Sequence, residues 1–163
     1  MTRTSISQSI WWHPVSDAVS LEKPIPNKNW EQFDSIEEFK CFNSIKRAIH
    51  QKDRFLTLTR QKSIVLLESP LIKWNVDFAL EFKDGDTTLI EYKGDWIRSH
   101  PCAELLLNYQ MSLIERIGIK FILVSKRGNL LPKNHRFKSR EISLRIVEST
   151  VRNIVAQKKN EER

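Results

Sequence analysis

Cysteine, glycine and long apolar segments are scarce in this chain. Two cysteines, Cys41 and Cys102, and four glycines occur among its 163 residues. The two cysteines lie far apart and form no paired motif, which predicts reduced thiols in a cytoplasmic protein. No apolar run approaches the roughly 18 residues that a membrane span needs. The first residues also lack the pattern of a signal peptide, so we expect a protein with no membrane partner.

Histidine spacing excludes two further kinds of site. The four histidines, His13, His50, His100 and His135, are isolated from one another along the chain. They show neither the short spacing of zinc ligands nor a pairing with serine that would indicate a nucleophilic site. We therefore assign none of them to catalysis.

The residues that are abundant indicate a globular, basic protein. Apolar residues make up 40% of the chain and include eight Phe and five Trp, which is enough for one domain with its own core. The 27 Lys and Arg exceed the 20 Asp and Glu and give a net charge of +7. The excess is concentrated after Lys120. It favours a polyanionic partner, with DNA as the first candidate.

The first part of the chain shows no sustained periodicity. Residues 1–32 contain Pro14, Pro24 and Pro26, which predict an irregular N-terminal arm. This region also contains three tryptophans, Trp11, Trp12 and Trp30. We interpret them as anchors that hold the arm against the body of the protein.

Two helices and several strands are predicted after this arm. A cap at Asp34 or Ser35 and apolar residues at helical spacing predict a helix over residues 35–50. A second helix, ended by Gly118, is predicted over 102–117 from apolar residues at helical spacing, namely Leu106, Tyr109, Leu113 and Ile117, with Leu105 and Ile114 alongside. Strands are expected over 55–67, 74–81, 87–92 and 119–124, the second and third joined by a turn at 83–86.

This order of elements predicts an α/β fold with a mixed central sheet flanked by helices, in the order α-β-β-β-α-β. The main domain is expected to span residues 33–147. Residues 148–163 are expected to add a C-terminal helix and a basic tail, with Gln157 to Arg163 in solvent.

Three ionisable side chains are predicted to converge on the hairpin. Antiparallel pairing brings Asp77 near the end of the next strand, where Glu91 and Lys93 share one face. Two adjacent carboxylates repel each other unless a cation neutralises them, and oxygen ligands select Mg²⁺, with Mn²⁺ as a substitute. Glu38 is chosen over Glu37 as a third acid because it shares a helix face with apolar residues. The set is typical of phosphodiester hydrolysis, with Lys93 stabilising negative charge.

These motifs resemble the PD-(D/E)xK nuclease superfamily. The similarity rests on Ser35-Ile-Glu-Glu38, Gln61, Val76-Asp77-Phe78 and Ile90-Glu91-Tyr92-Lys93-Gly94, and it covers residues 33–131. Val76 replaces the proline of the motif, which supplies no ligand. Within the superfamily the chain is most similar to the catalytic domains of the TnsA family of transposon endonucleases.

The resemblance implies a restriction-endonuclease-like core and a Mg²⁺-dependent endonuclease. Asp77, Glu91 and Glu38 would be its metal ligands and Lys93 its catalytic lysine. For a TnsA-like subunit it further implies cleavage at the 5′ ends of a transposon, together with a transposase subunit and an AAA+ regulator.

Several alternatives stay open at this stage. Glu91 and Lys93 can be a structural salt bridge, and Gln61 can be an ordinary sheet residue. A junction-resolving or site-specific endonuclease of a phage or plasmid, acting as a homodimer, fits the same motif. From another class, a non-catalytic DNA-binding assembly module fits the basic charge. In either DNA-binding case, the residues expected to contact phosphates are Lys126, Arg127, Lys133, Arg136, Lys138 and Arg140.

Overall fold

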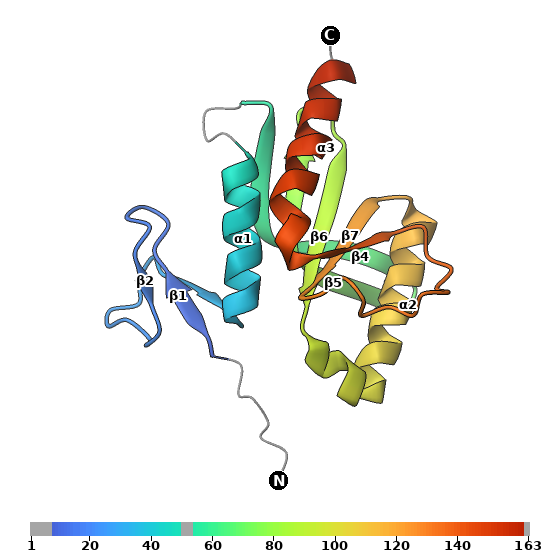
Figure 1. Ribbon diagram of the computed structural model, residues 1–163, viewed down its shortest axis with the longest axis horizontal. Coiled ribbons are helices and arrows are strands. Elements are labelled where there is room, and N and C mark those ends of the chain that lie inside the picture. The colour runs from blue at the N-terminus through green and yellow to red at the C-terminus, as the bar shows by residue number, and fades with distance from the viewer. Residues whose placement is uncertain (1–7, 50–53, 162–163) are drawn as a thin grey trace.

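A five-stranded mixed sheet forms the centre of the computed structural model, which describes residues 8–49 and 54–161 (Figure 1). The strand order is β4-β5-β6-β7-β8. The first three strands are antiparallel and the last three are parallel. The strands are β4 (Leu56–Glu68), β5 (Leu71–Phe82), β6 (Thr87–Lys93), β7 (Lys120–Ser125) and β8 (Arg140–Ser143). Because β6, β7 and β8 are parallel, their carboxyl ends meet at one edge of the sheet.

Within the described residues, three α-helices cover this sheet: α1 (Ile36–Ala48), α2 (Pro101–Ile117) and α3 (Val147–Glu161). The same part of the chain contains two short 3₁₀ helices, Asp95–Ser99 and Leu144–Ile146, which connect α2 and α3 to the strands that precede them. Helices α1 and α3 lie side by side on one face, and α2 covers the other face (Figure 1). The predicted α/β class, the mixed central sheet and the order α-β-β-β-α-β are therefore confirmed.

The helix ends follow from local chemistry. The Ser35 hydroxyl accepts a hydrogen bond from the Glu38 backbone N–H at 3.0 Å, and the Glu38 carboxylate accepts one from the Asp34 N–H, also at 3.0 Å. Helix α1 ends with Ile49 as its cap, and the predicted end at His50 lies outside the described residues. Helix α2 ends at Gly118, whose φ of +80° is easily adopted only by glycine.

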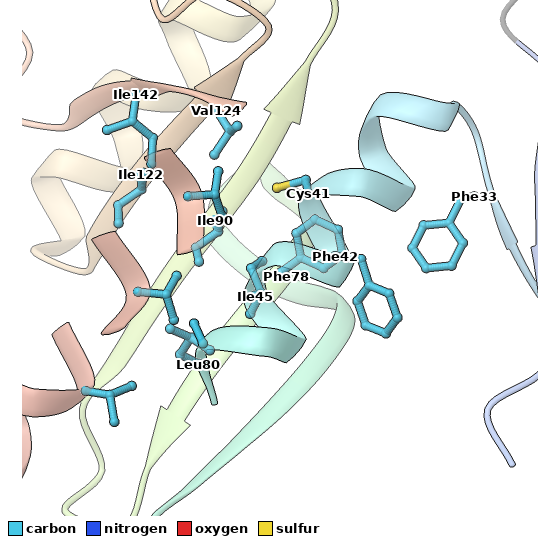
Figure 2. Close-up of a cluster of buried hydrophobic side chains, with 14 of the residues drawn as sticks. Phe33, Cys41, Phe42, Ile45, Phe78, Leu80, Ile90, Ile122, Val124 and Ile142 are labelled. Carbon is cyan, nitrogen blue, oxygen red and sulfur yellow. The ribbon is translucent and has the colours of Figure 1, made fainter. Parts of the chain in front are cut away.

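Apolar side chains fill the space on both faces of the sheet. Between the sheet and the α1–α3 pair, Phe42 and Ile45 of α1 pack on Phe78 and Leu80 of β5, and Ile90 of β6 lies beside them (Figure 2). On the other face, α2 packs on a separate buried cluster that contains Val76, Ala79, Leu89 and Leu123. The sheet that carries the predicted site is thus held firmly from both sides.

The second helix predicted from the sequence is present as α2, but only some of the apolar residues that indicated it face the sheet. Leu113 and Ile114 are buried, together with Leu107 and Met111. The other four apolar residues are exposed, namely Leu105, Leu106, Tyr109 and Ile117. The helix carries two overlapping apolar stripes, and packing on the sheet selects the stripe that contains Met111.

Residues 10–33 form a small antiparallel sheet, whereas their proline content predicted an irregular arm. Its strands are β1 (Ile10–Trp12), β2 (Val19–Ser20) and β3 (Glu31–Phe33), in the order β2-β1-β3. Trp12 anchors it, since this ring is buried and lies edge-on to Phe42 at 4.9 Å between centroids. Trp11 and Trp30 are only half-buried.

The end of the chain is also more ordered than predicted. Helix α3 continues through Glu161, and residues 162–163 lie outside the described residues. Lys158, expected in a solvated tail, is buried. Its ammonium group lies 2.8 Å from the Asp84 carboxylate and also pairs with Asp86, so α3 is tied to the β5–β6 turn.

None of the helices in the described part of the chain has the length and apolar character needed to cross a membrane.

Candidate functional site

The β5–β6 hairpin opens where the predicted acidic residues lie. The paired stretch of the two strands ends at Phe78 and Ile90. One residue beyond this pair are Asp77 on β5 and Glu91 on β6. The two carboxylates therefore occupy the fork at which the strands separate.

Reciprocal hydrogen bonds hold the two carboxylates in the fork. The Asp77 backbone N–H donates to Glu91 Oε2 at 2.9 Å, and the Tyr92 N–H donates to Asp77 Oδ2 at 2.9 Å. Each side chain thus accepts a main-chain hydrogen bond from the opposite strand, at the position where regular strand pairing would have continued. The structure brings Asp77 and Glu91 together as the hairpin register predicted.

Lys93 completes the cluster on β6. Its Nζ lies 2.5 Å from Glu91 Oε1, and the Glu91 side chain is almost fully buried, with a relative exposure of 1% for the residue. The salt bridge considered from the sequence is therefore present. It is more than a surface ion pair, because one partner is buried and also accepts the Asp77 N–H.

Burial and mutual repulsion raise the pKa values of these carboxyl groups above their ordinary values. Burial, followed by the Asp77 charge, raises the pKa of Glu91 to about 7. Burial also raises the pKa of Asp77, although Lys93 and the Tyr92 N–H act in the opposite direction. Burial alone would lower the pKa of Lys93, but Glu91 and the other nearby carboxylates raise it, so the lysine is a cation at neutral pH.

Glu38 reaches this cluster electrostatically from helix α1. It is buried, whereas its neighbour Glu37 is half-buried. Burial and then the Asp77 charge raise the pKa of Glu38 to about 7. The same carboxylate accepts the Asp34 N–H and lies 3.9 Å from Arg60. Helix capping and tertiary packing therefore both fix this third acid.

Two neighbouring residues on β4 complete the surroundings of the acids. Gln61, with an unusual φ of +49°, donates from Nε2 to Asp77 Oδ1 at 3.3 Å. Arg60 was missed from the sequence; its guanidinium lies 3.6 Å from the Phe33 ring centroid and pairs with Glu31. No spacing in the sequence marks Arg60, because its partners come from β3 and α1.

The six basic residues predicted to contact phosphates are exposed. They lie in the connection between β7 and β8 and at the first residue of β8. Among the described residues, none of the six forms a side-chain hydrogen bond or ion pair. Glu141 holds this connection in place, since its carboxylate accepts the N–H groups of Leu130 at 2.7 Å and Leu131 at 2.6 Å.

The donor atoms of the fork are of the kind that hard cations prefer. Asp77 and Glu91 offer carboxylate oxygens, and Mg²⁺ is commonly held by one or two carboxylates together with water and substrate phosphates. Over residues 8–49 and 54–161, however, no three or more His, Cys, Asp or Glu side chains are grouped so as to hold a metal ion. The two carboxylates that meet in the fork are those of Asp77 and Glu91, and their oxygens are of the type that a hard cation prefers.

Comparison with protein-family models, with curated proteins and with solved structures found no match.

Proposed function

We propose that this protein is a metal-dependent endonuclease that hydrolyses phosphodiester bonds of DNA on a restriction-endonuclease-like fold. The observation that carries the proposal is the fork at Asp77 and Glu91, where a half-buried and a buried carboxylate are held side by side with Lys93. Such an arrangement leaves two groups with raised pKa values, and a divalent cation would relieve their repulsion.

Each residue of the cluster has a role in this proposal. Asp77 and Glu91 hold the cation, Mg²⁺ or Mn²⁺, with their carboxylate oxygens. That ion, when bound, neutralises charge on the phosphate and makes water a better nucleophile. Lys93 is a cation at neutral pH and donates hydrogen bonds to the attacking water or to a phosphate oxygen as negative charge develops. Glu38 adds negative charge that favours the cation.

The narrower proposal is a TnsA-like subunit that cuts the 5′ ends of a transposon beside a transposase subunit and an AAA+ regulator. It rests on the sequence resemblance of residues 33–131. The adjacency of genes for an integrase-type transposase and an AAA+ ATPase would support this narrower proposal, and an isolated phage gene would favour the junction-resolving alternative.

Cleavage of a DNA substrate by active-site variants tests the proposal. We expect Asp77→Ala to abolish strand cleavage in Mg²⁺, and Lys93→Ala to slow it by about 100-fold or more, because transition-state charge is then uncompensated. DNA binding should change little in both variants. Glu68→Ala and Lys83→Ala are matched controls, since both residues are exposed and neither forms a side-chain hydrogen bond or ion pair within the described part of the chain. Full cleavage by the Asp77 and Lys93 variants would refute the proposal.

One observation favours a second candidate, a non-catalytic DNA-binding module. All four oxygens of Asp77 and Glu91 already have protein partners, namely Gln61, Tyr92, Lys93 and the Asp77 N–H. The polar side chains of the fork would then serve only to hold the two strands together. This candidate predicts salt-dependent DNA binding that is unaffected by Mg²⁺, and no cleavage by the wild-type protein.

A further inference from the structure

A basic pocket lies next to the carboxyl ends of β7 and β8. It has a volume of about 490 Å³ and is lined by residues of α1, of the segment after β7 and of the 3₁₀ helix after β8. Four of its seven lining residues are cationic and none is acidic; the seven are Lys40, Asn43, Ser44, Arg47, Lys126, Leu144 and Arg145. Only Lys126 among these four cations was predicted from the sequence to contact phosphates.

The positive charge of this pocket is largely uncompensated. Arg47 donates from Nε to Glu148 at 2.9 Å and from Nη2 to Ser44 at 3.1 Å. Within the described part of the chain, the ammonium and guanidinium groups of Lys40, Lys126 and Arg145 form no hydrogen bond or ion pair. All four cationic residues are exposed, so a ligand can reach them from solvent. Cations gathered without counter-charges create a local field that attracts anions with several acceptor oxygens.

The pocket is adjacent to the acidic fork. Ser125 on β7 is the register partner of Lys93 on β6, and Lys126 follows Ser125 directly. On the other side, Lys40 lies two residues after Glu38 on α1. The pocket and the fork therefore lie at the same edge of the sheet, with Lys126 one residue beyond the β7 partner of Lys93.

We propose that this pocket binds a backbone phosphate of a nucleic acid strand whose neighbouring phosphate lies at the fork, beside Lys93. The pocket is lined by four cationic side chains, which are the groups that proteins commonly use to contact phosphate oxygens. That the strand is DNA, and that its next phosphate lies in the fork, rests on the proposed function.

Salt-dependent binding in the presence of EDTA tests this proposal without any cleavage step. The double variant Lys126→Ala/Arg145→Ala should bind a labelled DNA duplex at least about tenfold more weakly at low salt. The slope of log affinity against log salt should become shallower by about 1 to 2, because each phosphate contact contributes about 0.9. A Lys126→Arg/Arg145→Lys variant should keep most of the wild-type slope, and unchanged thermal melting would show that both variants are folded.

The matched control also removes two positive charges, but at the other end of the strands, away from the pocket. Lys83 lies in the β5–β6 turn, and Lys120, at the start of β7, pairs with Asp86 at 3.7 Å with more than half of its side chain exposed. Lys83→Ala/Lys120→Ala should leave the salt slope near the wild-type value. If this control and the pocket variant lose affinity and slope equally, the effect is one of net charge and the proposal is overturned.

Inorganic phosphate separates a nucleic acid site from a site for small anions. If phosphate raises the melting temperature of the wild type but not of the pocket variant, while DNA affinity is the same in both, the pocket holds a free anion and the proposal is wrong. If the wild type never cleaves DNA, yet its binding in EDTA depends on Lys126 and Arg145, the nuclease proposal fails and the phosphate site is upheld.

Discussion

Glu38 and Glu91 are carboxyl groups that folding places in an unfavourable environment. Burial and the nearby Asp77 charge raise the pKa of each to about 7 from an ordinary value of 4.5. Between these two pH values the folded protein binds more protons than the unfolded chain. This tighter proton binding stabilises the folded protein. Its contribution is fully present below about pH 4.5 and is lost as the pH rises through about 7, so the free energy of unfolding falls over that interval.

Replacing Glu38 with glutamine should reduce this pH dependence. A rise from 4.5 to about 7 is about 2.5 pKa units, which corresponds to about 3 kcal/mol at 1.36 kcal/mol per unit. We expect the loss of unfolding free energy between about pH 5 and about pH 8 to shrink by that order in Glu38→Gln. Urea unfolding at the two pH values measures it. Glu37→Gln, one residue away and half-buried, is the control, and an unchanged pH dependence in Glu38→Gln would contradict the assigned burial cost.

Among the elements, the β5–β6 hairpin was the most predictable and its fork the least. Alternating apolar residues and a polar turn were enough to predict the pairing that brings Asp77 to Glu91. The reciprocal main-chain hydrogen bonds were not predictable, because they depend on where the strands separate. Arg60 was missed for a related reason, since its position beside the acids depends on contacts with Glu31 and Glu38, which lie far away in the sequence.

Helix α2 shows the limit of periodicity as a guide to burial. Three successive leucines, Leu105, Leu106 and Leu107, allow two apolar stripes about 100° apart. Only contact with the sheet decides between them, and it selects the stripe with Leu107 and Met111. The sequence alone shows where both stripes lie on the helix, but it does not indicate which of them faces the sheet.

The observed face of α2 predicts contrasting effects of two alanine substitutions. Met111 is fully buried, so Met111→Ala should lower the free energy of unfolding by about 2–5 kcal/mol through lost burial and a residual cavity. Leu105 is 71% exposed, and Leu105→Ala should change it by no more than about 0.5 kcal/mol. Denaturant unfolding of both variants compares them directly. A larger effect for Leu105 than for Met111 would show that the helix packs on its other stripe.

At the scale of the whole molecule, charge is separated along one edge of the sheet. Although the net charge is +7, three acids are gathered at the fork: Glu38 and Glu91 are buried and Asp77 is half-buried. Exposed bases, among them Lys126 and Arg145, lie at the neighbouring strand ends. The net charge can be counted from the composition. The spatial separation of acids from bases depends on the parallel arrangement of β6, β7 and β8, which the composition does not show. With this separation, the exposed bases can bind a polyanion while the neighbouring acids hold a cation beside it.

Calorimetric titration of Mg²⁺ and Mn²⁺ into the whole protein tests most directly whether the fork is a metal site. The titration is set at about pH 8, above the raised pKa of Glu91, so that the Glu91 carboxylate is ionised before the cation is added. We expect saturable heat in the wild type and in the control Glu68→Gln, and its loss in Asp77→Asn, which keeps the side-chain size but removes the charge. A wild type that gives no heat, or an Asp77→Asn variant that titrates like it, would contradict the proposal that Asp77 and Glu91 hold a catalytic metal ion.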